Sequence, residues 1–159
     1  MVLGFGNNTL KATQGKENII TRLIDEVFPD YEVVIPKDNN KILNINKKDL
    51  LGAIRRVSIF SNRSTHQVAL NLSADGCEVT TEDPERSSKA KESILAAYQG
   101  EEIRIGYNAE YLKDIVSHVQ GEEITIKFGS SVTAALFSSS EKEKNEENTM
   151  LLMPIRLNN

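Results

Sequence analysis

The sequence is poor in cysteine and contains no long apolar run. Among its 159 residues Cys77 is the one cysteine, which excludes an internal disulfide and favours a reducing compartment. No apolar run approaches the roughly 20 residues that a membrane-spanning helix requires. The first residues carry no basic region followed by an apolar stretch, so we expect no signal peptide. These absences predict a cytoplasmic protein.

Positive charge is in the minority as well. The chain has 19 lysine and arginine residues against 23 aspartate and glutamate residues, a net charge of −4. This balance argues against strong binding of nucleic acid by the whole surface, but it leaves room for a local basic face. The length is sufficient for one domain with a core, or for one domain and a piece of another.

The chain also lacks the converging acid, base and nucleophile that an enzyme needs. His66 and His118 have polar neighbours and no partner at metal-ligand spacing, which favours surface histidines. Cys77 begins a predicted strand and is interpreted as a small, partly buried residue. The acidic residues at 82–85 lack calcium-loop spacing, and the glycines form neither a phosphate loop nor a dinucleotide fingerprint. We therefore predict no catalytic site.

What the sequence does contain is one pattern used twice, a strand followed by a helix and three strands. In the first copy, residues 42–45 form a strand and Asn46 caps a helix; in the second, residues 103–105 and Asn108 do the same, and Gly121 ends the helix. The further predicted strands cover residues 67–72, 77–81, 89–98, 124–128 and 132–137. Two such units bury both helices on one face of a joined sheet, which predicts an α+β architecture.

The apolar stripes of the two predicted helices correspond at a constant offset. The matched positions are Asn46, Leu50, Ala53, Ile54 and Val57 in the first copy and Asn108, Leu112, Ile115, Val116 and Val119 in the second. This helical spacing predicts two amphipathic helices in equivalent places.

Residues 1–36 do not form a self-contained pattern. Strands are predicted at residues 2–5, 9–13 and 17–23, and residues 36–40 have the composition of a linker. Nothing else in this region supplies the rest of a sheet. We therefore expect residues 1–36 to be the end of one domain and residues 37–159 to be a second domain.

The C-terminal residues 151–157 are apolar at nearly every position and contain Pro154. They follow residues 138–148, which include no apolar side chain, so a solvated loop is predicted to lead into one final buried strand. Proline cannot donate a ladder hydrogen bond, so Pro154 places this strand at a sheet edge or ends its pairing. An apolar sheet edge is a common docking place for a peptide.

The first predicted helix carries basic residues on the face opposite its apolar stripe. Lys48 and Arg55 lie seven residues apart, with Gly52 between them and Lys47 and Arg56 alongside. Two interpretations stay open at this point. The face is either an ordinary solvated surface or a surface that contacts phosphates through charge alone.

Three features together resemble one known family. They are Phe28-Pro29-Asp30-Tyr31 followed by Pro36, the strand-helix unit ending in Ser61-Asn62, and residues 153–157 at the C-terminus. The chain is similar over nearly its whole length to the beta subunit of bacterial DNA polymerase III, the sliding clamp family. The resemblance covers the last strands of that family's middle domain and its complete C-terminal domain, so the chain is expected to be a fragment.

The resemblance implies a non-enzymatic processivity factor without a cofactor or metal. In this family two subunits close head to tail into a ring around duplex DNA, with helices lining the hole and sheets forming the outer wall. Partners such as the replicative polymerase, the clamp loader and repair proteins insert short linear motifs into a hydrophobic groove. Diffuse lysine and arginine contacts to phosphates allow such a ring to slide without reading sequence.

The resemblance also implies where the sites lie. The partner groove is expected to involve Pro29, Val33, Val34, Thr65, Ala134, Leu151, Leu152, Met153, Pro154, Ile155, Arg156 and Leu157. The subunit interface is expected at Ile59 and Phe60, and the DNA-facing residues are expected to be Lys48, Arg55, Arg56 and Lys113. The chain departs from the family at Val33, where arginine is frequent, and at Thr65, where an aromatic residue is frequent.

Two rivals from other classes remain open on the sequence. One is a stand-alone α+β protein-interaction module that uses the same edge strand and never encircles DNA. The other is a thiol enzyme built on Cys77, which has no motif behind it.

Overall fold

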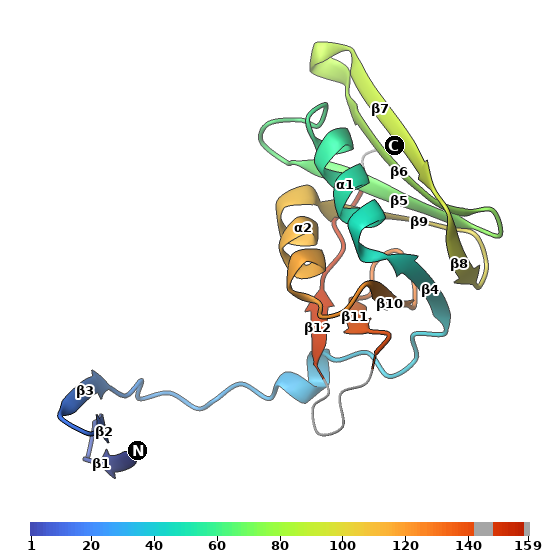
Figure 1. Cartoon of the computed structure of the whole chain (residues 1–159). Coiled ribbons are helices and arrows are strands. Elements are labelled where there is room, and N and C mark those ends of the chain that lie inside the picture. Colours follow the sequence, from blue (N-terminus) through green and yellow to red (C-terminus); the bar gives the residue numbers. More distant parts are fainter. Residues whose placement is uncertain (142–147, 158–159) are drawn as a thin grey trace. The chain divides into compact units, whose positions relative to one another are not determined.

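A computed structural model describes residues 1–141 and 148–157 of the chain. The chain divides into two compact units, Met1–Tyr31 and Glu32–Asn159, which are drawn in Figure 1 and described separately below.

The first unit is a three-stranded antiparallel sheet in the order β1-β2-β3. Its strands are β1 (Val2–Phe5), β2 (Thr9–Gln14) and β3 (Glu17–Arg22). Gly15 has φ +62° in the tight turn between β2 and β3, a conformation that glycine adopts without steric cost. The three strands predicted from the sequence are thereby confirmed. Most of their side chains are exposed, so this sheet buries no core of its own.

The second unit contains the predicted pattern of one strand, one helix and three strands, twice. The first copy comprises β4 (Lys41–Asn46), α1 (Lys47–Ser58), β5 (Gln67–Ser73), β6 (Gly76–Asp83) and β7 (Ser88–Ile94). The second comprises β9 (Ile103–Asn108), α2 (Ala109–His118), β10 (Glu123–Phe128), β11 (Ala135–Ser139) and β12 (Thr149–Leu152). The short β8 (Ala96–Gln99) lies between the copies, and η1 (Tyr31–Val34) and η2 (Pro84–Arg86) are single 3₁₀ turns.

Both helices begin at an asparagine cap, as the sequence predicts. The side chain of Asn46 accepts hydrogen bonds from the backbone N–H groups of Lys48 and Asp49. The side chain of Asn108 accepts from the N–H groups of Glu110 and Tyr111. Each cap thereby satisfies two N–H groups that have no partner within the first helical turn.

The strands of the second unit form two sheets, and the helices pack side by side against them (Figure 1). The five-stranded sheet has the order β12-β11-β10-β4-β8 and the four-stranded sheet the order β7-β6-β5-β9. Each sheet therefore contains strands from both copies. The core between sheets and helices includes the fully buried side chains of Leu43, Leu50, Ile54, Leu70, Tyr107, Leu112, Ile126, Phe128 and Phe137. The predicted α+β fold with a duplicated unit is confirmed.

Three local predictions need correction. The strand expected at residues 132–137 begins only at Ala135, because hydrogen bonds between Ser130 and Thr133 form a turn just before it. The single strand expected at residues 89–98 is divided at Leu95, because β7 belongs to the four-stranded sheet and β8 to the five-stranded sheet. The second helix ends at His118 rather than at Gly121, since the backbone of Val119 is already extended. Gly121, with φ +84°, instead forms the turn that leads into β10. No helix in the described part of the chain is long and apolar enough to cross a membrane.

Candidate functional site

The C-terminal segment connects the edges of the two sheets. β12 is the edge strand of the five-stranded sheet, where Leu151 pairs with Leu136 and Leu152 with Ala135 of β11. Pairing stops before Pro154, and the N–H of Ile155 then donates to the carbonyl of Gly106 at 2.8 Å on the edge of the other sheet. The proline thus ends one ladder and the chain crosses to the next.

The final strand is not buried as predicted. The exposure of Leu151 and Leu152 is intermediate, and the side chain of Met153 is 57% exposed. An edge strand is covered on one side only, so apolar side chains remain accessible there. The correction leaves more apolar surface open to a partner than the sequence led us to expect.

Gly106 makes the close approach of the C-terminal segment possible. A Cβ atom at this position would lie 2.6 Å from Cδ2 of Leu157 and 2.7 Å from the carbonyl oxygen of Ile155. Only a residue without a side chain allows this packing. Sequence reasoning missed Gly106, although a glycine inside a strand is a known sign that another backbone approaches closely.

A surface pocket of about 440 Å³ lies where the segment meets β9. Its lining consists of Arg104, Gly106, Ser131, Val132, Ile155, Arg156 and Leu157. Three of these, the last three, belong to the predicted partner groove. Val132 is 63% exposed, and Arg104 and Arg156 place two positive charges beside this apolar surface. Sequence reasoning missed Val132 because it placed this residue in the strand predicted at residues 132–137, whereas Val132 lies in the loop before β11.

The structure places the other predicted groove residues in separate elements of the chain. Ala134 is buried, and its carbonyl accepts from the side chain of Asn39 at 2.9 Å. Thr65 is exposed just before β5, and its carbonyl accepts from Asn108 at 3.2 Å. Val33 and Val34 are 76% and 58% exposed in η1. Pro29 is part of the first unit, which is described by itself.

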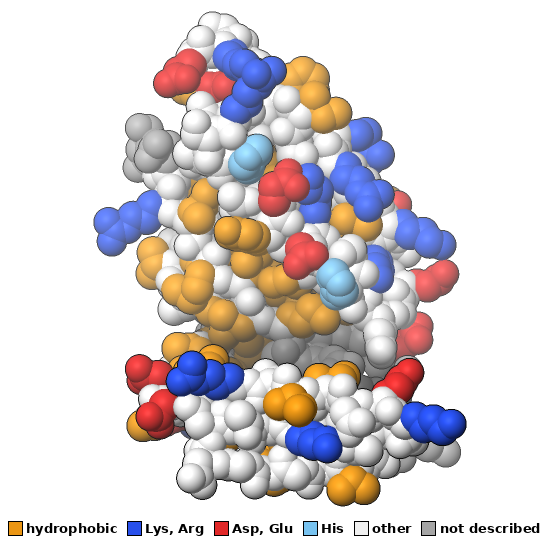
Figure 2. Space-filling model, turned by 90° about the vertical axis from the view of Figure 1, so that its left-hand side faces the viewer, with side chains coloured by type: hydrophobic (Ala, Val, Ile, Leu, Met, Phe, Trp, Pro, Cys, Tyr) orange, Lys and Arg blue, Asp and Glu red, His pale blue; other side chains and the backbone are white. Residues whose placement is uncertain are grey.

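Of the predicted DNA-facing residues, Lys48, Arg55 and Arg56 on α1 are exposed, whereas the side chain of Lys113 on α2 is 24% exposed. The ammonium of Lys48 lies 3.6 Å from Glu122, and that of Lys113 lies 2.7 Å from Glu110. Arg56 forms a two-point ion pair with Glu92 of β7. Within residues 1–141 and 148–157, Arg55 forms no ion pair. Figure 2 shows basic side chains along the upper and right-hand edges of one face of the second unit, beside a gathering of apolar ones.

Lys47 has a different surrounding from its basic neighbours. Its ammonium donates to the carbonyl of Ser117 at 2.8 Å and to that of Val119 at 2.6 Å, at the C-terminal end of α2. The last carbonyls of a helix have no partner within the helix and carry partial negative charge. Lys47 therefore joins the start of α1 to the end of α2 and is not part of the basic face beside which the sequence places it.

Ile59 and Phe60, the predicted subunit interface, follow directly after α1. Their side chains are 77% and 46% exposed, an adjacent pair of large apolar residues on the surface. Exposed apolar clusters of this kind are typical of interaction surfaces.

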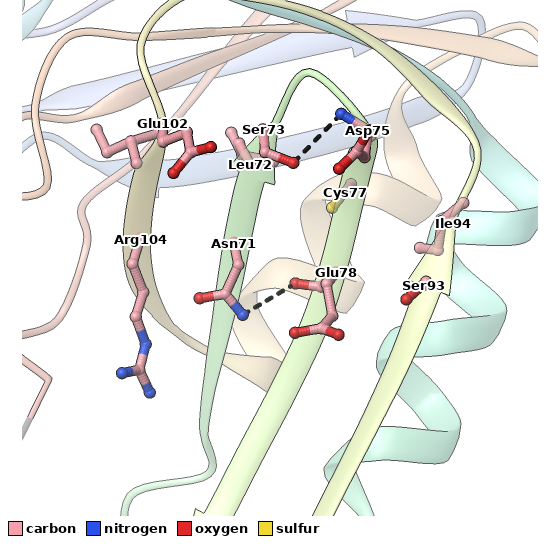
Figure 3. A pocket seen from close by; sticks show the side chains of 12 residues that line it. Asn71, Leu72, Ser73, Asp75, Cys77, Glu78, Ser93, Ile94, Glu102 and Arg104 are labelled. Atoms are coloured by element: carbon pink, nitrogen blue, oxygen red, sulfur yellow. Dashed lines mark hydrogen bonds between the residues drawn. The ribbon is translucent and has the colours of Figure 1, made fainter.

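Cys77, the residue on which a thiol enzyme would depend, lies in the core. Cys77 is 2% exposed, and burial raises the pKa of its thiol to about 12, so the reactive thiolate is scarce at neutral pH. It is one of the residues that line a surface cavity of about 520 Å³ on the four-stranded sheet. Figure 3 shows Asn71, Glu78 and Arg104 projecting from that sheet around the cavity. The described residues hold no cluster of side chains suited to a metal ion.

Comparison with known families identifies this arrangement. The family described as "DNA polymerase III beta subunit, C-terminal domain" matches residues 32–156. The chain belongs to the DNA polymerase III beta subunit family. The match includes both copies of the repeated unit and the C-terminal segment up to Arg156. The resemblance found in the sequence is thereby confirmed.

Relatives in this beta subunit family are similar over nearly the whole chain. The beta sliding clamp of Pseudomonas putida is 30% identical over 152 residues, which cover 96% of this chain and 40% of that protein. The beta sliding clamp of Proteus mirabilis is 32% identical over 155 residues, covering 98% of this chain and 41% of that protein. The chain thus spans about 40% of the length of the curated relatives it matches.

Solved structures of beta subunits have the same fold. The sliding clamp of Pseudomonas aeruginosa bound to griselimycin is 28% identical with a TM-score of 0.88, and the match covers 98% of this chain and 41% of that one. The clamp of Bartonella birtlesii bound to griselimycin is 29% identical with a TM-score of 0.89, again covering 98% and 41%.

Proposed function

We propose that this chain acts as part of a sliding clamp, a ring that encircles duplex DNA and tethers the replicative polymerase to it. In this role the chain performs no chemistry and needs no cofactor. It supplies helices to the inner wall of the ring, sheets to the outer wall and part of a groove for short peptide motifs of the polymerase, the clamp loader and repair proteins.

The observation that carries the proposal is the match of residues 32–156 to the C-terminal domain of clamp subunits, on a chain with the same duplicated fold. Helix α1 presents Lys48, Arg55 and Arg56 on exposed positions, while its apolar stripe of Leu50, Ala53, Ile54 and Val57 is buried. Such a surface supports contacts to phosphates without base readout, as a sliding ring requires.

The C-terminal segment supports the second half of the proposal. Leu151, Leu152 and Met153 leave apolar surface accessible at a sheet edge, and the pocket beside Ile155 and Leu157 is flanked by arginines. A short peptide could place its apolar anchor residues against this surface, and its acidic groups could form ion pairs with Arg104 and Arg156.

A chimeric clamp tests the proposal. In it, this chain replaces the matching 155 residues of the Proteus mirabilis clamp, and primer extension by that organism's replicative polymerase is measured at physiological salt. We expect processive synthesis with the chimera. Reversing Lys48 and Arg55 to glutamate should shorten the products, because phosphate contacts are lost from the inner wall.

The matched control reverses Lys89 and Lys91 on β7, which changes the net charge equally on exposed lysines away from the helices. We expect products of normal length from this variant. A chimera that folds and binds clamp peptides but never supports processive synthesis would favour the alternative function, a protein-interaction module that does not encircle DNA.

A further inference from the structure

Arg56 of α1 is held by a carboxylate of the neighbouring sheet. Its Nε donates to Oε2 of Glu92 at 3.0 Å and its Nη2 donates to Oε1 at 2.5 Å, a two-point arrangement that is the strongest form of this ion pair. Glu92 pairs across the sheet with the core residue Val79, so it projects from the side of the sheet that faces the helices. These hydrogen bonds hold the pKa of the Glu92 carboxyl below its ordinary value.

Gly52 provides the space for this arrangement. A Cβ atom at position 52 would lie 3.1 Å and 3.2 Å from the two terminal nitrogens of Arg56, one turn further along the helix. Side chains on a helix lean toward its N-terminus, so the guanidinium of Arg56 lies over this glycine. Glycine is unfavourable in the middle of a helix, and no turn or positive φ requires it here. A side chain at position 52 would displace the guanidinium of Arg56 from where it lies in this structure.

The other basic side chains of this surface are held less firmly. Lys48 has one contact at 3.6 Å to Glu122, and both side chains are more than three-quarters exposed. Arg55 has no ion pair among the described residues. On α1 it is therefore Arg56 that an outside anion can bind only in competition with Glu92, which already forms two hydrogen bonds to it.

We propose that Glu92 occupies the guanidinium of Arg56 and so weakens the contact between this helix surface and DNA. This inference rests on the proposed clamp function. A phosphate and the Glu92 carboxylate both fit the planar guanidinium fork, and one fork cannot serve both fully at once. While Glu92 neutralises Arg56, the guanidinium does not replace a condensed cation at a phosphate, so a contact between Arg56 and DNA releases few counterions and gains little. A clamp that must slide is served by contacts that exchange easily.

Binding of the full chain to a short fluorescent DNA duplex tests this inference through fluorescence anisotropy over a series of salt concentrations. We expect Glu92→Gln to strengthen binding by roughly tenfold at about 50 mM salt and to steepen the salt dependence by about one unit, the effect of one added phosphate contact. The double variant Arg56→Gln with Glu92→Gln should return to the level of the unmodified chain.

The chain offers a closely matched control in Glu78→Gln. Glu78 pairs with Lys91 at 3.6 Å, and its side chain is 33% exposed against 32% for Glu92. Glu78 pairs across the sheet with Ser93 and lines the cavity of Figure 3, on the face away from α1. Glu78→Gln changes the net charge as much as Glu92→Gln does, but it leaves the pair of Arg56 and Glu92 intact. DNA binding should therefore rise much less with Glu78→Gln.

Several outcomes would overturn the inference. These are equal gains from Glu92→Gln and Glu78→Gln, a gain that persists without Arg56, and no DNA binding by Glu92→Gln at the lowest salt. The Nε–H signal of Arg56 in a ¹⁵N spectrum reports independently whether the guanidinium has been released. Loss of synthesis when Lys48 and Arg55 are reversed in the chimera, without a gain from Glu92→Gln, would leave the clamp function standing and reject only the role of Glu92.

Discussion

At the scale of single residues, Gly106 determines how the C-terminal segment attaches. We expect Gly106→Ala to lower the free energy of unfolding by about 1–3 kcal/mol, the usual cost of forcing atoms into a packed site. The reason is that the added Cβ would overlap Leu157 and the carbonyl of Ile155. Urea unfolding measures this loss, and faster hydrogen exchange of the Ile155 amide would locate it.

Gly4→Ala is a suitable control for this change. Gly4 also lies in a strand, but a Cβ there meets nothing within 4 Å. Equal stability losses from both substitutions would mean that general strand effects, and not the contact with the C-terminal segment, explain the result at Gly106.

Cys77 gives the stability of the fold a pH dependence on the alkaline side. Burial raises the pKa of its thiol to about 12 in the folded chain, above the value in the unfolded chain. Below the unfolded pKa both states keep the proton, so the thiol contributes no pH dependence there. Above it the unfolded state loses the proton first, and the free energy of unfolding falls by up to about 1.4 kcal/mol per pH unit.

Replacing Cys77 by alanine should therefore flatten this alkaline decline. Urea unfolding between about pH 8 and pH 11 measures the effect, because the window begins near the ordinary thiol pKa. Burial also raises the pKa values of Tyr98 and Tyr107, but both tyrosines are present in the two proteins and cancel in the comparison. Parallel pH profiles for the parent and the variant would contradict the prediction.

At the scale of secondary-structure elements, Lys47 connects the two helices. We expect Lys47→Met to lower the free energy of unfolding by about 1–2 kcal/mol, because two charge-assisted hydrogen bonds to the end of α2 are lost. The neighbouring Lys48→Met should cost less than about 0.5 kcal/mol, since its ion pair is exposed. Thermal or urea unfolding of both variants measures these two free-energy losses. Equal losses would show that Lys47 has no special role.

The edge segment after β12 should matter more for partners than for folding. Met153 is 57% exposed, so Met153→Asp should change stability by less than about 0.5 kcal/mol. In the chimeric clamp, however, it should strongly weaken binding of a fluorescent clamp-binding peptide, because a charge then faces an apolar anchor. Leu95→Asp, at a position 92% exposed and distant in sequence, is the control expected to bind normally. A domain unfolded by Met153→Asp would show that the segment is chiefly structural.

At the scale of the whole molecule, the exposed pair Ile59 and Phe60 should close the ring. Replacing both by aspartate in the chimeric clamp should convert dimers to monomers, since burying two charges in an apolar interface is costly. Light scattering after size-exclusion chromatography measures the change. Aspartate at exposed Val33 and Val34, an apolar pair in η1, should leave the dimer intact. A ring that survives the first change would place the subunit interface elsewhere.

The sequence by itself determined the repeated unit, its helices and their caps. These features depend on neighbours within a few residues: Asn46 and Asn108 cap by contacts to the next turn, and apolar spacing selects the buried helix face. Three short features, at residues 28–36, at Ser61-Asn62 and at residues 153–157, also sufficed to indicate the family that the comparison then confirmed. Local chemistry carries this information because it does not depend on where the rest of the chain lies.

Only the tertiary structure decided which side chains meet across the fold. The strand predicted at residues 89–98 divides at Leu95 because its two halves pair in different sheets. The partner of Arg56 lies 36 positions away in the chain, that of Lys47 about 70 and that of Ile155 49. Such contacts form because burial of the apolar faces brings distant elements together, and hydrogen-bond donors then pair with the acceptors placed beside them. A sequence pattern read over a few turns contains the donors and the acceptors, but not their distances.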